Sequence, residues 1–207
     1  MPVPNRQEIT PLNSKSELTR MRIVDLQPED ESLIKQAAEL LLVSFREHWP
    51  EAWPDLESAE QEVRESLSHE RISRVALDES GDLLGWIGGI RQYDGNVWEL
   101  HPLAVSPEAR GRGVGRALVE DLETQARERG GLTLWLGTDD EDGMTTLSGV
   151  NLYPDILSRI ANIKNLKRHP YEFYQKLGFI IVGVMPDANG PGKPDIYMAK
   201  SLIRSPR

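Results

Sequence analysis

A run of glycines and arginines in the middle of the chain is the segment best suited to bind an anion. It follows an apolar stretch that ends at Val105, precedes an amphipathic helical pattern, and has the sequence Arg110-Gly111-Arg112-Gly113-Val114-Gly115-Arg116. Glycines let successive backbone N–H groups approach an anion, and a helix N-terminus adds partial positive charge to that of three arginines. The segment therefore predicts a pyrophosphate site, although a glycine-rich loop can also simply turn the chain.

Two common phosphate-binding patterns do not fit this run. A dinucleotide-binding unit has its glycines after the first strand of a βαβ unit and an acidic residue about 20 residues later. A Walker loop ends in Gly-Lys-Ser/Thr. Here a predicted meander of three strands precedes the glycines, and the run contains no lysine. Neither pattern therefore accounts for the run.

A second group of charges follows a predicted buried strand at 132–136. Four consecutive carboxylates there belong to Asp139, Asp140, Glu141 and Asp142. Like charges in one loop repel each other unless a cation screens them, so the run favours a polycationic partner. A plain solvated loop and a divalent-ion site are the alternatives, but the spacing lacks the alternation of a calcium loop.

Composition narrows the class of protein. The 207 residues include 33 Asp and Glu against 24 Lys and Arg, and the net charge of −9 argues against a protein that wraps duplex nucleic acid. The absence of cysteine excludes disulfides, thiolate metal sites and thiol nucleophiles. No run reaches the length of a membrane span, and residues 1–20 lack the apolar centre of a secretory signal, so a cytoplasmic protein is expected.

Hydrophobic periodicity predicts one α+β domain at 21–203, preceded by a flexible extension at 1–20. Its sheet is expected to be mixed and mostly antiparallel, because three of its strands form a meander. The predicted strands are 22–26, 72–77, 83–93, 96–105, 132–136, 179–185 and 196–200, and the predicted helices are 31–48, 56–68, 114–129, 154–163 and 169–177.

The glycine run and a late segment together resemble the GCN5-related N-acetyltransferases, the GNAT family. Residues 110–115 resemble the family's acetyl-CoA signature, Arg/Gln-x-x-Gly-x-Gly/Ala, and the strand before them, Leu103-Ala104-Val105-Ser106-Pro107, also matches. A second match is to the late helix motif Phe-Tyr-x-Lys-x-Gly-Phe, on Phe173-Tyr174-Gln175-Lys176-Leu177-Gly178-Phe179. The resemblance spans 22–202 and implies a GNAT fold, splayed where acetyl-CoA lies between the strands 96–105 and 132–136.

The resemblance implies acetyl-CoA as cosubstrate and no metal. Strand backbone at 103–105 would pair with the pantetheine and the thioester carbonyl, while N–H groups from 112–117 would hold the pyrophosphate. One departure is Lys167, which stands where the family commonly has an asparagine. The implied cofactor-binding residues are Leu103, Ala104, Val105, Arg110, Gly111, Arg112, Gly113, Val114, Gly115, Arg116 and Ala117.

Amine acetylation requires a base for the ammonium proton, donors for the oxyanion and an acid for the departing thiolate. Side chains alternate along a strand, so Glu99 and His101 share one face with Leu103 and Val105. Glu99 is the first candidate for the base and His101 the second. The resemblance implies that Tyr174 is the acid. A solvated Glu99, a hydrogen-bonded His101 and a Tyr174 that only packs are the structural alternatives.

Within the family, the chain most resembles the aminoglycoside 6′-N-acetyltransferases, on segments 134–140, 169–179, 186–190 and 192–196. This implies direct transfer, in a ternary complex, to a cationic small-molecule amine that carboxylates bind. The fold implies that the loop between the first two helices borders the acceptor, unless it is a surface staple. Trp49 and Trp53 would be its walls, and the anionic contacts would be Glu51, Asp55, Asp139, Asp140, Glu141 and Asp142.

Other functions stay open at this point. A polyamine, another small amine or a protein N-terminus would also suit an acidic acceptor site. A non-catalytic acyl-CoA sensor would keep the glycine loop, but the presence of Glu99 and Tyr174 argues against it. We expect no nucleic-acid or membrane partner, and exchange of late strands between subunits, common in the family, is compatible with a homodimer.

Overall fold

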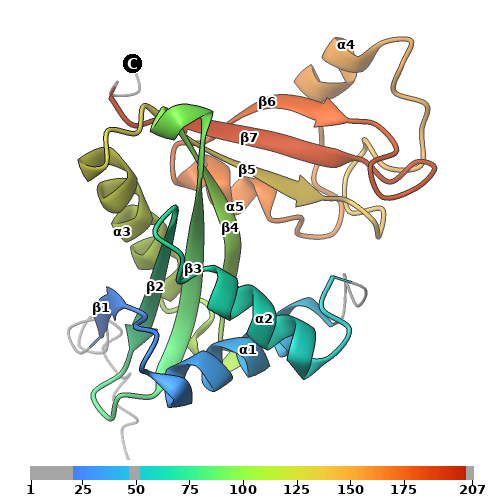
Figure 1. Ribbon diagram of the computed structural model, residues 1–207. Helices are drawn as coiled ribbons and strands as arrows, with labels where there is room; N and C mark the ends of the chain where they lie inside the picture. The colour runs from blue at the N-terminus through green and yellow to red at the C-terminus, as the bar shows by residue number, and fades with distance from the viewer. Residues whose placement is uncertain (1–20, 47–51, 204–207) are drawn as a thin grey trace, which may run out of the picture.

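One sheet of seven strands runs through residues 21–46 and 52–203, the part of the chain that the computed structural model describes. The strands lie in the order β1-β2-β3-β4-β5-β7-β6, and among them β4 and β5 form the one parallel pair (Figure 1). The strands are β1 (Arg22–Asp25), β2 (Arg71–Leu77), β3 (Leu83–Gln92), β4 (Val97–Val105), β5 (Thr133–Asp139), β6 (Ile180–Met185) and β7 (Asp195–Ser201).

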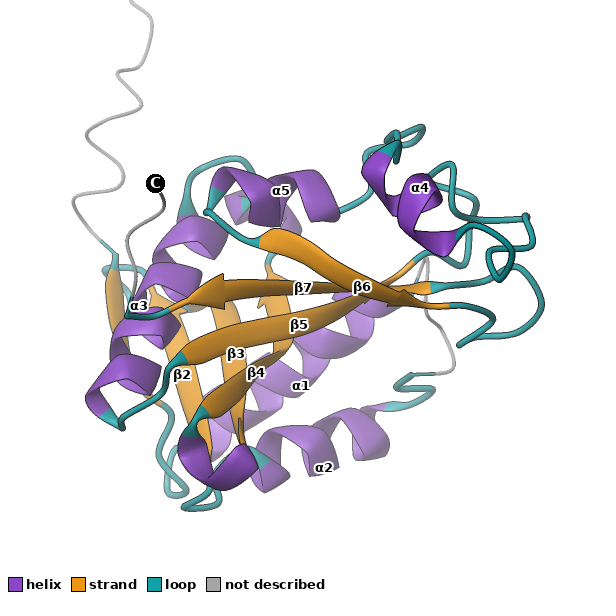
Figure 2. Ribbon diagram, turned by 90° about the horizontal axis from the view of Figure 1, so that it is seen from above, coloured by secondary structure: helices purple, strands orange, loops and turns teal. Residues whose placement is uncertain are grey.

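Helices cover both faces of this sheet. Figure 2 shows α1 and α2 on one face and α3 and α5 on the other, with α4 near one end of β6. The helices are α1 (Glu31–Phe45), α2 (Leu56–Glu65), α3 (Val114–Glu128), α4 (Ile156–Ala161) and α5 (Tyr171–Lys176), with short 3-10 turns at Tyr93–Gly95 and Pro107–Ala109. None of the helices in the described ranges combines the length and the apolar character needed to cross a membrane.

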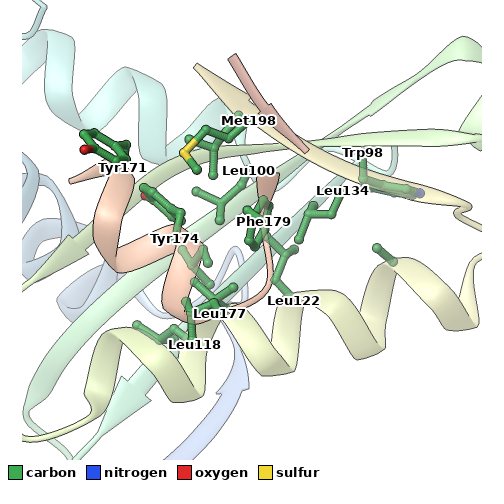
Figure 3. Packing of buried hydrophobic residues seen from close by; sticks show 14 of the residues in the cluster. Trp98, Leu100, Leu118, Leu122, Leu134, Tyr171, Tyr174, Leu177, Phe179 and Met198 are labelled. Carbon is green, nitrogen blue, oxygen red and sulfur yellow. The ribbon is translucent and has the colours of Figure 1, made fainter. Parts of the chain in front are cut away.

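Apolar side chains at helical spacing fill a core on each face of the sheet. Leu118 and Leu122 of α3 belong to the same buried cluster as Trp98 and Leu134 of the strands, and Figure 3 shows this cluster continuing to α5. On the other face, α1 and α2 pack against Trp86 and its neighbours. Each large apolar side chain that is fully buried stabilises the fold by about 2 kcal/mol. These cores hold the strand ends in fixed positions.

The sheet opens between β4 and β5. Their pairing covers only three positions and ends at Glu99↔Trp135. Beyond that point, β4 stays with β3 as far as Gly85↔Val105, and β5 stays with β7 as far as Asp139↔Asp195. The two central strands therefore diverge while each remains held on its other side. This confirms the predicted α+β fold with a mixed, mostly antiparallel sheet that is splayed in the middle.

All predicted helices and strands are present, and most of their bounds differ from the prediction by one to three residues. The difference that affects the site is in β5, which continues to Asp139 instead of ending at Leu136, because β7 pairs with it over this length. Asp139 is therefore a strand residue. The predicted extension at 1–20 and the predicted acceptor residues Trp49 and Glu51 lie outside the described residues.

Candidate active site

A cavity of about 650 Å³ lies where β4 and β5 diverge. Its walls come from β4, the glycine loop, the start of α3, the end of β5 and α5, with Phe45 of α1 on the remaining side. The sequence-predicted residues that line it are Trp53, His101, Leu103, Val105, Arg110, Gly111, Gly113, Val114, Gly115, Arg116, Asp139 and Tyr174. The structure thus brings together parts of the chain that lie more than 100 residues apart.

The glycine loop presents backbone N–H groups to this cavity. Gly111 and Gly113 have φ angles of +73° and +91°, which favour glycine, and Gly113 begins α3 without a capping side chain. The first N–H groups of a helix have no acceptor within the helix, so they remain available to an anion. Arg110 and Arg116 line the cavity beside them, whereas Arg112 and Ala117 do not line it.

The backbone of β4 forms a second wall of the cavity. Since β5 has diverged from β4 at this level, the residues from Leu103 to Val105 have no strand partner on that side. An extended ligand can pair with such an edge as if it were an added strand. The side chain of Ala104 is buried on the opposite face, so only its backbone is placed to contact a ligand here.

Tyr174 of α5 lines the cavity and is only 9% exposed. Its ring packs edge-on against Phe173 and Phe179, with centroid distances of 5.1 and 5.7 Å. Burial raises the pKa of the Tyr174 hydroxyl, which therefore stays protonated and neutral at physiological pH. The residue therefore both packs in the core and contributes to the cavity wall.

Glu99 and His101 lie on the same, partly exposed face of β4. His101 lines the cavity, and its ring centroid is 6.0 Å from that of Trp53. Glu99 lies outside the lining, and its Oε2 accepts a hydrogen bond of 2.6 Å from Gln92 Nε2. Burial raises the pKa of the Glu99 carboxyl, although the nearby His101 and the Gln92 hydrogen bond act in the opposite direction.

The four consecutive carboxylates have different environments. Asp139 lines the cavity, and burial raises its pKa although Asn189 Nδ2 donates to its Oδ1. Asp140 is fully buried and accepts hydrogen bonds of 2.6 and 2.7 Å from the backbone N–H groups of Met144 and Thr145. Asp140 directly follows β5 and its backbone N–H donates to the Pro194 carbonyl, so it continues the strand geometry and points to the face opposite Asp139. Asp140 therefore holds the loop that follows β5 and does not face the cavity.

The other two carboxylates of the run lie in that loop, outside the cavity lining. Glu141 Oε2 is 3.1 Å from Lys193 Nζ, and the exposed Asp142 accepts a hydrogen bond through its backbone carbonyl from Lys167 Nζ. Lys167, the residue that departs from the family pattern, is thus bound to the loop. Of the run, only Asp139 contributes directly to the cavity wall.

Of the two predicted acceptor residues between α1 and α2 that the structure describes, Trp53 and Asp55, one lines the cavity and the other does not. Trp53 lines the cavity and packs against Phe45 with a centroid distance of 4.9 Å. Asp55 is instead the N-cap of α2, where its Oδ1 accepts a 2.8 Å hydrogen bond from the Ser58 backbone N–H. This bond holds the pKa of the Asp55 carboxyl below its usual value. Asp55 therefore caps a helix and does not line the cavity.

Asp195 is a functional candidate that the sequence analysis missed. It pairs with Asp139 across the β5–β7 ladder, and a Cβ on Gly137 would lie 2.6 Å from Asp195 Oδ2. The carboxyl thus lies over a glycine that lines the cavity, and its Oδ1 is buried without a hydrogen-bond partner among the described residues. Burial, together with Asp139 and Glu99, raises the pKa of Asp195 to about 7. The one available signal was a glycine inside an apolar strand, which often marks a close approach.

No cluster of His, Asp and Glu within residues 21–46 and 52–203 is arranged to hold a metal ion. The cavity instead combines the N-terminus of a helix, a strand edge without a strand partner, a neutral phenol and the carboxyl of Asp139, with those of Glu99 and Asp195 on the flanking strands outside its lining. The first two suit the phosphates and the extended arm of coenzyme A. The other groups suit proton transfer to and from an amine and a thiolate.

Comparisons with known proteins agree with this geometry. Residues 34–145 match the model of the acetyltransferase (GNAT) family. A solved aminoglycoside 6′-N-acetyltransferase in complex with coenzyme A is 43% identical, with a TM-score of 0.81, over 90% of this chain and 99% of that one. The enzyme of that name from Enterococcus faecium is also 43% identical over the same shares, with a TM-score of 0.80. An aminoglycoside 6′-acetyltransferase of type Ii is 38% identical over 89% and 99%, with a TM-score of 0.68. The chain therefore belongs to the GNAT family and is an acetyl-CoA-dependent N-acetyltransferase.

Proposed function

We propose that this protein acetylates an aminoglycoside, at the 6′-amino group, by direct transfer from acetyl-CoA in a ternary complex. The observation that carries the proposal is a pair of carboxyls: Asp139 lines the cavity, and Asp195, its register partner on β7, lies over the cavity-lining Gly137. Aminoglycosides carry several ammonium groups, and carboxylates bind such groups through charge-assisted hydrogen bonds. The similarity to aminoglycoside 6′-N-acetyltransferases supports the same acceptor.

Acetyl-CoA, when bound, supplies an activated acetyl group. In the proposal, the unpaired edge of β4 from Leu103 to Val105 orients the pantetheine arm and the thioester. The N-terminus of α3, with Arg110 and Arg116, binds the pyrophosphate. Backbone N–H groups of the same β4 edge stabilise the oxyanion that develops as the amine attacks.

Two protein groups carry the protons. Glu99 accepts the proton of the attacking ammonium, directly or through a water molecule, and its raised pKa brings it closer to the pH at which a base works best. His101, which lines the cavity, is the second candidate for this base. Tyr174 donates a proton to the departing thiolate, for which its neutral hydroxyl is suited.

The acceptor is held by charge and by shape. Asp139 and Asp195 bind its ammonium groups, and Trp53 forms an apolar wall beside them. Burial raises the pKa of both carboxyls, so a polycation that approaches them favours their ionised forms. Asp55 and Asp140 are left out of this set, because their carboxylates already accept backbone hydrogen bonds.

The test measures CoA release by the purified protein with acetyl-CoA and kanamycin, tobramycin, spermidine or a basic peptide. Mass spectrometry of each product identifies the acceptor, and NMR of the aminoglycoside product identifies the acetylated nitrogen. We expect a gain of one acetyl group on the 6′-amino group of kanamycin and tobramycin. Turnover of spermidine or of the peptide, without turnover of either aminoglycoside, would mean that the enzyme acetylates another amine and would refute the proposed acceptor. Binding of acetyl-CoA without turnover of any amine would favour the sensor.

A further inference from the structure

We propose that Gln92 is a positioning residue that holds the Glu99 carboxylate for proton transfer, and that Trp135 fixes the Gln92 amide in the orientation this requires. The inference rests on the proposed function, in which Glu99 accepts the proton of the amine. It concerns two residues outside the cavity lining that belong to neither family motif. Both act on the reaction through Glu99.

Three neighbouring strands contribute one residue each to this arrangement. Gln92 is the last residue of β3, Glu99 lies on β4 and Trp135 lies on β5. Gln92 Nε2 donates to Glu99 Oε2 at 2.6 Å, and Gln92 Oε1 accepts from Trp135 Nε1 at 2.9 Å. Glu99 and Trp135 are also the last residues of β4 and β5 that pair with one another. These two hydrogen bonds form a Trp135–Gln92–Glu99 bridge, which lies at the point where β4 and β5 begin to diverge.

The chemistry of the indole fixes the direction of the bridge. An indole N–H only donates, so the amide oxygen of Gln92 must face Trp135. The NH₂ group of the same amide then faces Glu99 and donates to its carboxylate. If the amide were reversed, both contacts would be lost, with an NH₂ group against an N–H and an oxygen against a carboxylate. Trp135 therefore controls how Gln92 meets Glu99, although the indole does not touch the carboxylate itself.

A neutral donor at this place affects both the position and the acidity of Glu99. Charged and titratable groups of the same sheet act on this carboxylate, namely His101 of β4, Arg71 of β2, and Asp195 and Tyr197 of β7. Burial raises the pKa of Glu99, while His101, Gln92 and Arg71 lower it. Of these, Gln92 donates directly to a carboxylate oxygen, so it also fixes the orientation of the Glu99 carboxylate.

The first experiment is a pH profile of kcat/KM for the aminoglycoside. Gln92→Met keeps the length of the side chain but removes both hydrogen bonds, so the pKa of Glu99 rises. Since the base must be ionised, the acidic limb of the profile moves to higher pH, by about one pH unit. We expect kcat to fall about tenfold to a hundredfold, with little change in KM. Trp135→Phe should shift the limb in the same direction with a smaller loss.

The matched control is Gln61→Met on α2. Gln61 also donates to a glutamate, at 2.9 Å to Glu65 Oε1, but on the exposed surface of the helix. The same substitution there removes a Gln–Glu hydrogen bond far along the chain from β4, and its pH profile should match that of the wild-type protein. Binding of CoA and the thermal midpoint, measured on every variant, report on folding.

A second measurement does not depend on the acceptor. NMR titration of protein labelled with ¹³C at the glutamate carboxyls follows Glu99 directly, and Glu99→Gln identifies its signal. We expect the Gln92→Met variant to titrate at higher pH than the wild-type protein. An unchanged titration and an unmoved acidic limb, with activity lost only as stability falls, would overturn the proposal. If the wild-type protein acetylates no aminoglycoside, the proposed function fails, but this titration still decides the role of Gln92.

Discussion

The carboxyl of Asp195 offers a quantitative test of the site. Its pKa of about 7 compares with an ordinary value of 3.8, so the folded protein holds a proton there between about pH 4 and 7 that the unfolded chain has released. Stability therefore decreases as pH rises through this window. A difference of about 3 pH units corresponds to about 4 kcal/mol, and partial exposure of the carboxyl reduces this to about 2 kcal/mol.

The perturbation is Asp195→Asn, which keeps the shape of the side chain but cannot ionise. At pH 8 the variant should be about 2 kcal/mol more stable than the wild-type protein, and at pH 4 the two should agree. Urea unfolding at pH 4, 5, 6, 7 and 8 measures the difference. Asp82→Asn, an exposed residue in the turn before β3, is the control and should follow the wild-type curve. Parallel curves for Asp195→Asn and wild type would refute the argument that this carboxyl is destabilised by burial.

The same substitution should weaken binding of the acceptor. If Asp195 binds an ammonium group as a carboxylate, calorimetry at pH 8 should show aminoglycoside affinity reduced about tenfold in Asp195→Asn, while acetyl-CoA affinity stays unchanged. In the wild-type protein the affinity should fall between pH 7 and 5, because binding must then release the proton that Asp195 holds. An affinity independent of pH over this range, with the variant equal to wild type, would remove Asp195 from the proposed acceptor site.

Three further predictions concern separate parts of the site. Gly113→Asp should reduce the affinity for acetyl-CoA, measured by calorimetry, more than a hundredfold, because φ at Gly113 is +91° and the new charge repels phosphate. The control is Gly81→Asp, at a φ of +90° in an open turn, which should leave this affinity unchanged. Tyr174→Phe should lower kcat about tenfold to a hundredfold in steady-state assays, with unchanged CoA binding, and unaltered turnover would exclude it as the acid. Asp140→Asn should cost about 1 to 3 kcal/mol in urea unfolding, because a carboxylate that accepts two buried N–H groups is lost, and a variant as stable as wild type would contradict its structural role.

The parts of the site that a local pattern encodes were predictable from the sequence. The glycine loop and the start of α3 depend on neighbours within a few residues, so their position beside the cavity followed from the run at 110–116. The common face of Glu99 and His101 followed from the alternation of a strand. Tyr174 followed only from resemblance, because no spacing within a short helix indicates which of its side chains lines a cavity.

The parts that depend on pairing between distant strands were not predictable in this way. The four carboxylates at 139–142 formed one group in the sequence, but β7 extends β5 to Asp139 and thereby separates that residue from Asp140. Asp195 meets Asp139 across 56 positions of the chain, and only the register of the ladder brings them together. Gln92 likewise meets Trp135 over 43 positions. Charge counted along the chain therefore overestimated the number of carboxylates of this run that line the cavity.

The divergence of β4 and β5 connects the stability of the protein with its activity. It leaves one backbone edge of β4 without a strand partner, and it leaves Glu99, Asp139 and Asp195 partly buried on the adjacent strands β4, β5 and β7. Burial raises the pKa of all three carboxyls, so each charged form destabilises the free protein. A polycationic amine reverses this effect when it binds, because it replaces lost hydration with opposite charge. Under the proposed function, the cost of ionising these carboxyls in the free protein is thus converted into affinity for the acceptor, beside the strand edge where its amine attacks.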